Sequence, residues 1–301
     1  MPTETLNYLD PEVLAKLQGL RLRAARIVEG YVSGLHRSPY QGFSVEFAEH
    51  REYAQGDDLR YVDWKVFGKT DKVYLKQYEE ETNLIAYLVL DTSESMRYQS
   101  EGAPLSKLEY AQCAAASLAH LVIHQQDSVG LTTFDDQVRQ LVRPSSSATH
   151  LKQLLQVMEE SEPIRKTRTG PIFHELAERL TRRGIVFILS DLFDDADEML
   201  AGLKHFKHRR HDVVVMQVLD PAELDFPFQH ATLFHGMEQM GDLLVEPAQL
   251  RRAYKNEIES FTAKVRTGCL SQQADYLQVR TDMPLDTVLT TYLAKRRRRV
   301  R

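Results

Sequence analysis

The run from residue 84 to residue 90, Leu-Ile-Ala-Tyr-Leu-Val-Leu, is continuously apolar and ends at Asp91. A strand that is buried on both faces of a sheet has this pattern, and such strands occur mainly in parallel sheets covered by helices. In an open sheet of that kind, ligands bind beyond the carboxyl ends of the strands. The run therefore predicts a central strand of an α/β domain, with a candidate functional position directly after it.

Strand-like and helix-like patterns alternate through the rest of the chain. Two further apolar runs, residues 184–190 and 213–219, also end in an aspartate, at Asp191 and Asp220. We expect further strands at 128–134 and 276–279, and helices at 106–124, 150–158, 172–182, 198–208, 247–265 and from residue 284. This alternation predicts a three-layer, Rossmann-like α/β domain with a mostly parallel sheet and helices on both faces.

The first 82 residues have a different pattern. Apolar residues recur at helical spacing from Leu14 to Val28, after a proline at residue 11, which predicts one amphipathic helix. Residues 35–82 mix glycine, aromatic and charged residues without a helical period, and residues 72–78 alternate as a half-exposed strand does. We therefore predict an N-terminal helix and β-rich accessory segment over residues 1–82, and the α/β domain over residues 83–301.

The charge balance and the cysteines limit the possible partners and location. The 301 residues include 43 acidic and 38 basic ones, and the net charge of −5 gives no bulk attraction to nucleic acid, so we expect no nucleic-acid partner. Two isolated cysteines fit a reducing compartment. No run reaches the roughly 18 apolar residues of a membrane span, and the N-terminus lacks a signal-peptide pattern. We expect a cytoplasmic protein without a membrane span.

The residues after the first apolar run form the pattern Asp-x-Ser-x-Ser, at Asp91, Ser93 and Ser95. One carboxylate and two hydroxyls are hard oxygen ligands, which suit Mg²⁺, Mn²⁺ or Ca²⁺. Asp191 follows a similar strand and should lie at the same edge of the sheet. A third hydroxyl, from Thr167 or Thr169, precedes the helix expected at 172–182. The sequence thus predicts a divalent-cation site.

This order of residues resembles the von Willebrand factor A-type (vWA) domain and its metal-ion-dependent adhesion site. In that family the hydroxyls contact the cation directly, the aspartates act largely through water, and one coordination position is left for a carboxylate of a protein partner. The resemblance implies that the ligands are Asp91, Ser93, Ser95, Thr167 and Asp191, with Thr169 as a competitor for the role of Thr167.

Several blocks also resemble a bacterial family called domain of unknown function 58 (DUF58), in which such a domain follows a specific N-terminal segment. The blocks are residues 42–46, 51–58, 60, 63–64, 76–79, 174–178, 190–195 and 219–223. The resemblance implies a non-catalytic adaptor that works with a MoxR-type AAA ATPase in the assembly or activation of a protein complex. Members commonly carry transmembrane helices, which this sequence lacks.

An enzyme is the main alternative. A strand that ends in aspartate also describes haloacid-dehalogenase-like phosphatases, so Asp91 is a candidate nucleophile of a metal-dependent phosphoester hydrolase. Those enzymes need a second acid two residues on, where this chain has Ser93, and no Walker A motif or Gly-x-Ser-x-Gly elbow is present. We therefore expect no catalysis. Closure of the cation site by the chain's own Glu94 or Asp194 stays open.

Overall fold

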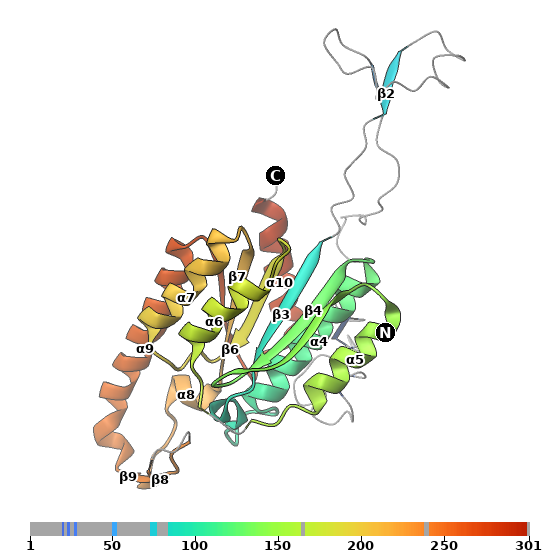
Figure 1. Ribbon diagram of the computed structural model, residues 1–301. Coiled ribbons are helices and arrows are strands. Elements are labelled where there is room, and N and C mark those ends of the chain that lie inside the picture. The colour runs from blue at the N-terminus through green and yellow to red at the C-terminus, as the bar shows by residue number, and fades with distance from the viewer. Residues whose placement is uncertain are drawn as a thin grey trace, which may run out of the picture. The chain divides into compact units, whose positions relative to one another are not determined.

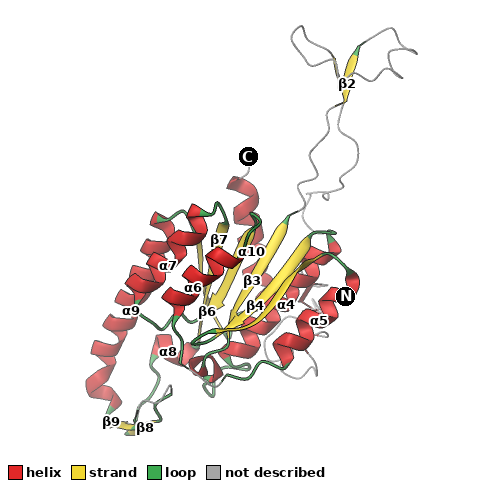
Figure 2. Ribbon diagram, viewed as in Figure 1, coloured by secondary structure: helices red, strands yellow, loops and turns green. Residues whose placement is uncertain are grey.

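The computed structural model describes residues 20, 23–24, 27–28, 50–52, 73–76, 84–163, 166–237 and 241–299. The chain divides into two units, one of residues 1–34 with 84–301 and the other of residues 35–83. Within the described residues, the larger unit is built on a six-stranded sheet with helices on both faces (Figures 1 and 2).

The sheet has the strand order β10-β7-β6-β3-β4-β5. Its strands are β3 (Ile85–Asp91), β4 (Ser128–Phe134), β5 (Val138–Ser145), β6 (Ile185–Ser190), β7 (Asp212–Leu219) and β10 (Asp275–Arg280). All neighbours pair in parallel except β4 and β5, which are antiparallel. Every residue of β3 and of β6 is buried, as expected for central strands covered on both faces.

Helices cover the two faces of the sheet separately. The buried core on one face includes residues of α4 (Lys107–His124), α5 (Ala148–Glu159) and α10 (Leu285–Arg299). The core on the other face includes residues of α6 (Thr169–Arg179), α7 (Ala196–His208) and α9 (Pro247–Ser271). The predicted three-layer α/β fold with a mostly parallel sheet is confirmed.

Short elements line the carboxyl edge of the sheet. The 3₁₀ helix η2 (Glu94–Arg97) follows β3, and α8 (Pro221–Asp225) follows β7. A small hairpin of β8 (Thr232–Phe234) and β9 (Leu243–Val245) comes after α8. Because the parallel strands all end at this edge, the segments that follow them gather there (Figure 1).

The start of α4 is fixed by a capping box. The Ser106 hydroxyl accepts from the Glu109 N–H at 3.2 Å, and the Glu109 carboxylate accepts from the Ser106 N–H at 3.0 Å. Such a cap stabilises a helix by about 1 kcal/mol. It also sets the position of Lys107, the first residue of the helix.

The described residues near the N-terminus lie in the core of the larger unit. Leu20, Ala24 and Ile27 are buried together with residues of the sheet and of α4. The described residues of the predicted N-terminal helix therefore belong to the larger unit, whereas the prediction grouped this helix with the accessory segment. An apolar helix face needs a partner surface, and the core of the domain provides it.

The smaller unit contains one described strand pair, β1 (His50–Glu52) with β2 (Tyr74–Lys76), which is antiparallel. Strand β2 lies inside the stretch 72–78 that the sequence indicated as a strand. Most of residues 1–82 lies outside the described residues, including the family-like blocks at 42–46, 60 and 63–64 and most of the block at 51–58. Among the helices that are described, none has the length and apolar character needed to cross a bilayer.

Candidate metal centre

Two neighbouring strands bring Asp91 and Asp191 to the same edge of the sheet. Strand β3 ends at Asp91, and Asp191 directly follows β6, which pairs in parallel with β3 in the register Leu90 to Leu189. Both aspartates are fully buried. The sequence predicted this meeting from two apolar runs that each end in an aspartate.

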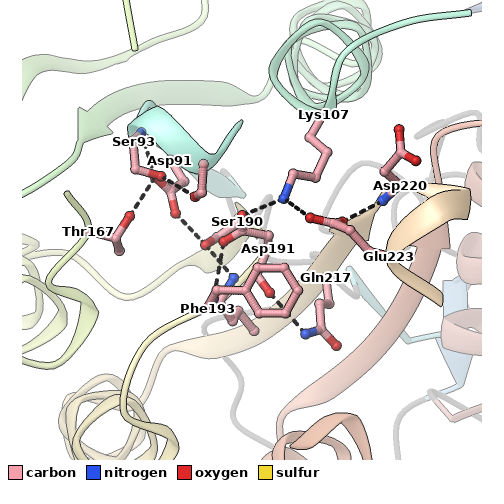
Figure 3. A network of polar contacts seen from close by, with 12 residues as sticks. Asp91, Ser93, Lys107, Thr167, Ser190, Asp191, Phe193, Gln217, Asp220 and Glu223 are labelled. Atoms are coloured by element: carbon pink, nitrogen blue, oxygen red, sulfur yellow. Dashed lines mark hydrogen bonds and ion pairs between the residues drawn. The ribbon is translucent and has the colours of Figure 1, made fainter. Parts of the chain in front are cut away.

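The carboxylate of Asp91 is surrounded by hydroxyl and amide donors (Figure 3). Its Oδ1 accepts from the Ser93 N–H at 2.9 Å and from the Thr167 hydroxyl at 3.5 Å. Its Oδ2 accepts from the Ser190 hydroxyl at 2.5 Å. The Ser93 and Ser95 hydroxyl oxygens lie 3.1 Å apart. The structure therefore brings together Asp91, Ser93, Ser95 and Thr167.

The two candidate threonines have different surroundings. Thr167 is buried in the loop before α6 and contacts Asp91. Thr169 begins α6, and both its N–H and its hydroxyl donate to the Asp194 carboxylate, at 2.7 and 2.9 Å. Asp194 thus accepts a hydrogen bond from a backbone N–H in the first turn of the helix, as a capping side chain does. The geometry favours Thr167 over Thr169 as the third hydroxyl of the site.

Asp191 has a partner that the sequence did not indicate. Its Oδ2 accepts from the Lys107 ammonium at 2.7 Å, and its Oδ1 accepts from the Phe193 N–H at 3.1 Å. The same ammonium lies 2.6 Å from Glu223 Oε1. Lys107 is only 1% exposed. Asp191 is therefore part of a buried ion-pair cluster beside Asp91.

Further contacts extend this ion-pair cluster. Glu223 Oε2 accepts from the Asp220 N–H at 2.8 Å, within the capping box that starts α8. The rings of Phe193 and Tyr98 lie against the Lys107 ammonium, with centroids 4.9 and 5.9 Å from Nζ. The ammonium is thus enclosed by carboxylates and aromatic faces, which stabilise a cation.

The buried charges shift the pKa values of their neighbours. Burial, and then the negative charge of Asp191, raise the pKa of Asp91 to about 7, against the opposing effect of its hydrogen bonds from Ser190 and Ser93. Burial alone would lower the pKa of Lys107, but Asp191 and Glu223 outweigh it and raise that pKa. Burial also raises the pKa of Glu223, although the positive charge of Lys107 acts in the opposite direction.

The donor set fits a hard divalent cation. Asp91 forms no ion pair with any described residue, so its buried charge has only hydrogen bonds to compensate it. Carboxylate and hydroxyl oxygens are ligands that Mg²⁺, Mn²⁺ and Ca²⁺ accept. Among the described residues, no group of three or more His, Cys, Asp and Glu side chains is suited to a metal. A cation here would therefore depend on Ser93, Ser95 and Thr167 for part of its coordination.

Sequence reasoning missed Lys107, Ser190 and Glu223. A lysine in the first turn of a helix is usually solvated, and Ser190 is the last residue of an apolar run. Only Glu223 carries a local signal, because Asp220 and Glu223 have the spacing of a capping box after a strand.

Comparisons with known proteins identify the family. The model of the family described as "Protein of unknown function DUF58" matches residues 49–264. The chain is 25% identical over 294 residues to the uncharacterized proteins Mb1516 of Mycobacterium bovis and Rv1480 of Mycobacterium tuberculosis. Each of these matches covers 96% of this chain and 91% of the relative.

Solved structures similar to this chain include BatB and the VWA domain of SpRpn10. BatB from Bacteroides thetaiotaomicron has 15% identity and a TM-score of 0.46, over 70% of this chain and 98% of that chain. The VWA domain of SpRpn10 has 12% identity and a TM-score of 0.40, over 69% and 94%. The family match covers more than two thirds of the sequence, and the chain therefore belongs to the DUF58 family.

Proposed function

We propose that this chain is a non-catalytic adaptor that binds a protein partner through a divalent cation, Mg²⁺ or else Mn²⁺ or Ca²⁺. The cation would be held at Asp91, Ser93, Ser95 and Thr167, with Asp191 beside them. The observation that supports this most directly is the gathering of three hydroxyl-bearing residues, Ser93, Ser95 and Thr167, at the buried Asp91 carboxylate.

The chemistry of this donor set favours recognition of a carboxylate. Neutral hydroxyls donate little negative charge, so a cation held mainly by them remains short of negative charge. An Asp or Glu side chain of a partner is then a good final ligand. A site of this kind works as a metal-dependent contact between two proteins.

The proposed partner is a MoxR-type AAA ATPase in the cytoplasm, and the proposed role is the assembly or activation of a protein complex. The resemblance to the DUF58 family implies this partner and this role. The sequence has no Walker A motif, so any dependence on ATP would come from the partner.

The geometry does not favour the phosphoester hydrolase alternative. Asp91 Oδ2 accepts from Ser190 and Oδ1 accepts from Ser93, as they would in either role. The residue two positions on, Ser93, is a hydroxyl rather than a carboxylic acid, and its oxygen contacts that of Ser95. No second acid is placed there to protonate a leaving group.

Thermal denaturation with and without Mg²⁺ tests the cation site. We expect Mg²⁺ to raise the Tm of the wild type and to have no effect on Asp91→Asn, which removes the charge but keeps the shape of the side chain. Asp127→Asn is the matched control, because Asp127 accepts from the Leu84 N–H at the opposite end of β3. This control should retain the full Mg²⁺ effect. Phosphoester turnover that requires Asp91 would contradict the proposal.

A pull-down of the MoxR-type ATPase with and without chelator tests the partner. We expect capture in Mg²⁺, loss of capture in chelator, and no capture by Asp91→Asn under either condition. If the complex survives chelation unchanged, the cation does not connect the two proteins and this part of the proposal is wrong.

A further inference from the structure

The position of Lys107 needs a physical reason. It is the first residue of α4, where the helix dipole disfavours a positive charge, and it is almost completely buried. Burial of an ammonium is costly unless carboxylates pair with it. Lys107 has two such partners, Asp191 and Glu223, at 2.7 and 2.6 Å. The ammonium is therefore held here by the carboxylates of the candidate metal centre.

Lys107 makes the two aspartates of the centre unequal. Both oxygens of Asp191 are engaged, one by the ammonium and one by the Phe193 N–H. Asp91 accepts only hydroxyl and amide hydrogen bonds from described residues. A cation that enters the centre therefore meets one carboxylate that is free of ion pairs and one whose charge is already neutralised.

We propose that Lys107 is a positioning residue that keeps Asp191 away from the cation and lowers the affinity of the centre for divalent cations. The inference rests on the proposed function and deepens it. Because the Lys107 ammonium neutralises Asp191, that carboxylate no longer offsets the positive charge of the bound cation. The carboxylate of a protein partner then supplies the missing negative charge. Lys107 thereby makes the cation bind more weakly without the partner than with it.

The expected size of the effect follows from Coulomb repulsion between the ammonium and the cation. The ammonium lies 2.7 Å from Asp191 Oδ2, and a cation beside that carboxylate would be repelled strongly at an effective dielectric constant of about 20. Removal of the ammonium also frees Asp191 Oδ2 as a ligand. We therefore expect Lys107→Met to bind Mg²⁺ at least about tenfold more tightly than the wild type.

Calorimetric titration of the full chain with Mg²⁺ alone tests the inference. The variants are Lys107→Met, the double variant Lys107→Met with Glu223→Gln, and Lys264→Met. The double variant removes the ammonium together with one of its two carboxylates, so its net charge equals that of the wild type and fewer unpaired charges remain buried. Lys264→Met is the matched control, because Lys264 pairs with Asp197 at 2.8 Å on the surface.

A second readout separates this role from simple packing. Without Mg²⁺, Lys107→Met should have a lower Tm than the wild type, because Asp191 and Glu223 lose their partner. With Mg²⁺, its Tm should rise by more than that of the wild type, since the cation replaces the missing charge. A lysine that only packs would give the same loss of Tm with and without Mg²⁺.

The outcomes distinguish this inference from the proposed function. Tighter Mg²⁺ binding by both Lys107 variants, with Lys264→Met unchanged, supports the inference. Equal or weaker binding by the Lys107 variants overturns it, even if the wild type binds Mg²⁺ as the proposed function requires. If the wild type does not bind Mg²⁺ but the Lys107 variants do, the cation-dependent function fails and the inference holds. If none of them binds, both fail.

Discussion

The Ser190 hydroxyl donates to the Asp91 carboxylate across two neighbouring strands, with 2.5 Å between Ser190 Oγ and Asp91 Oδ2. The same Oγ accepts from the Leu192 N–H at 2.9 Å. Ser190 therefore joins the end of β6 to the end of β3 and orients one oxygen of the aspartate on which the candidate metal centre depends. It is a structural support of the site rather than one of its predicted ligands.

Ser190→Ala should destabilise the protein by about 1–3 kcal/mol, because it leaves a buried carboxylate oxygen and a buried N–H without their partner. Urea denaturation measures this change. Ser117→Ala is a suitable control, since Ser117 is equally buried but donates only to Cys113 O within α4. A loss in Ser190→Ala no larger than in this control would show that the link between the strands contributes little.

Substitution of Thr167, which precedes α6, and of Thr169, which begins it, should have different effects. Thr167→Val should reduce the Mg²⁺-induced rise in Tm, because it removes a hydroxyl beside Asp91. Thr169→Val should leave that rise unchanged and lower the stability by about 0.5–1.5 kcal/mol, since it removes one hydrogen bond to Asp194. The opposite assignment of the two effects would identify Thr169 as the ligand.

His211 should make the stability depend on pH. Burial lowers its pKa in the folded protein, where its ring meets the edges of Tyr87 and Phe206. In the unfolded chain the His211 imidazole binds a proton near pH 6.5, whereas in the folded chain it does so only at a lower pH. The contribution of the neutral ring to the free energy of unfolding is therefore present above pH 6.5 and is lost as the pH falls.

Urea denaturation at several pH values between 5 and 8 checks this linkage. The difference in unfolding free energy between the wild type and His211→Gln should shrink as the pH falls, because the variant has no imidazole to protonate. A difference that stays constant over this range would contradict the assignment. The comparison with the variant removes the contributions of carboxyl groups such as Asp91.

The close contact between α6 and α7 should not tolerate a methyl group. A Cβ atom added at Gly202 would lie 2.8 Å from the Gly170 carbonyl oxygen and 2.9 Å from Phe173 Cβ. Gly202→Ala should therefore destabilise the protein by about 1–3 kcal/mol through overpacking. Gly102→Ala, where an added Cβ meets no atom within 4 Å, should be close to neutral. Equal stabilities of the two variants in urea denaturation would refute this account.

The central strands were predictable because a strand buried on both faces of the sheet is a continuous apolar run in the sequence. The runs that end at Asp91 and Asp191 correspond to β3 and β6 almost residue for residue. Strand β5 was missed because all of its residues are exposed or partly exposed, so Val138–Ser145 has no continuous apolar run. An edge strand of this kind resembles a loop until its pairing with β4 is known.

The candidate site was predictable where its residues belong to a local motif or directly follow an apolar run. Asp91, Ser93 and Ser95 form one local motif, whereas Lys107 and Asp191 are 84 positions apart and Ser190 and Asp91 are 99 apart. A local pattern cannot indicate which distant charge will be buried beside it. The chain topology decides this, and the ion-pair cluster therefore emerged only with the fold.

Strand β5 also limits how this protein can associate. It forms one edge of the sheet and contains Arg139, Arg143 and Pro144. Charged side chains and a proline on an edge strand oppose pairing with a strand of another molecule, which is a common route to aggregation. The sheet is thus protected against extension on this side, so a partner that binds at the carboxyl ends of the strands does not have to compete with strand pairing between copies of the chain.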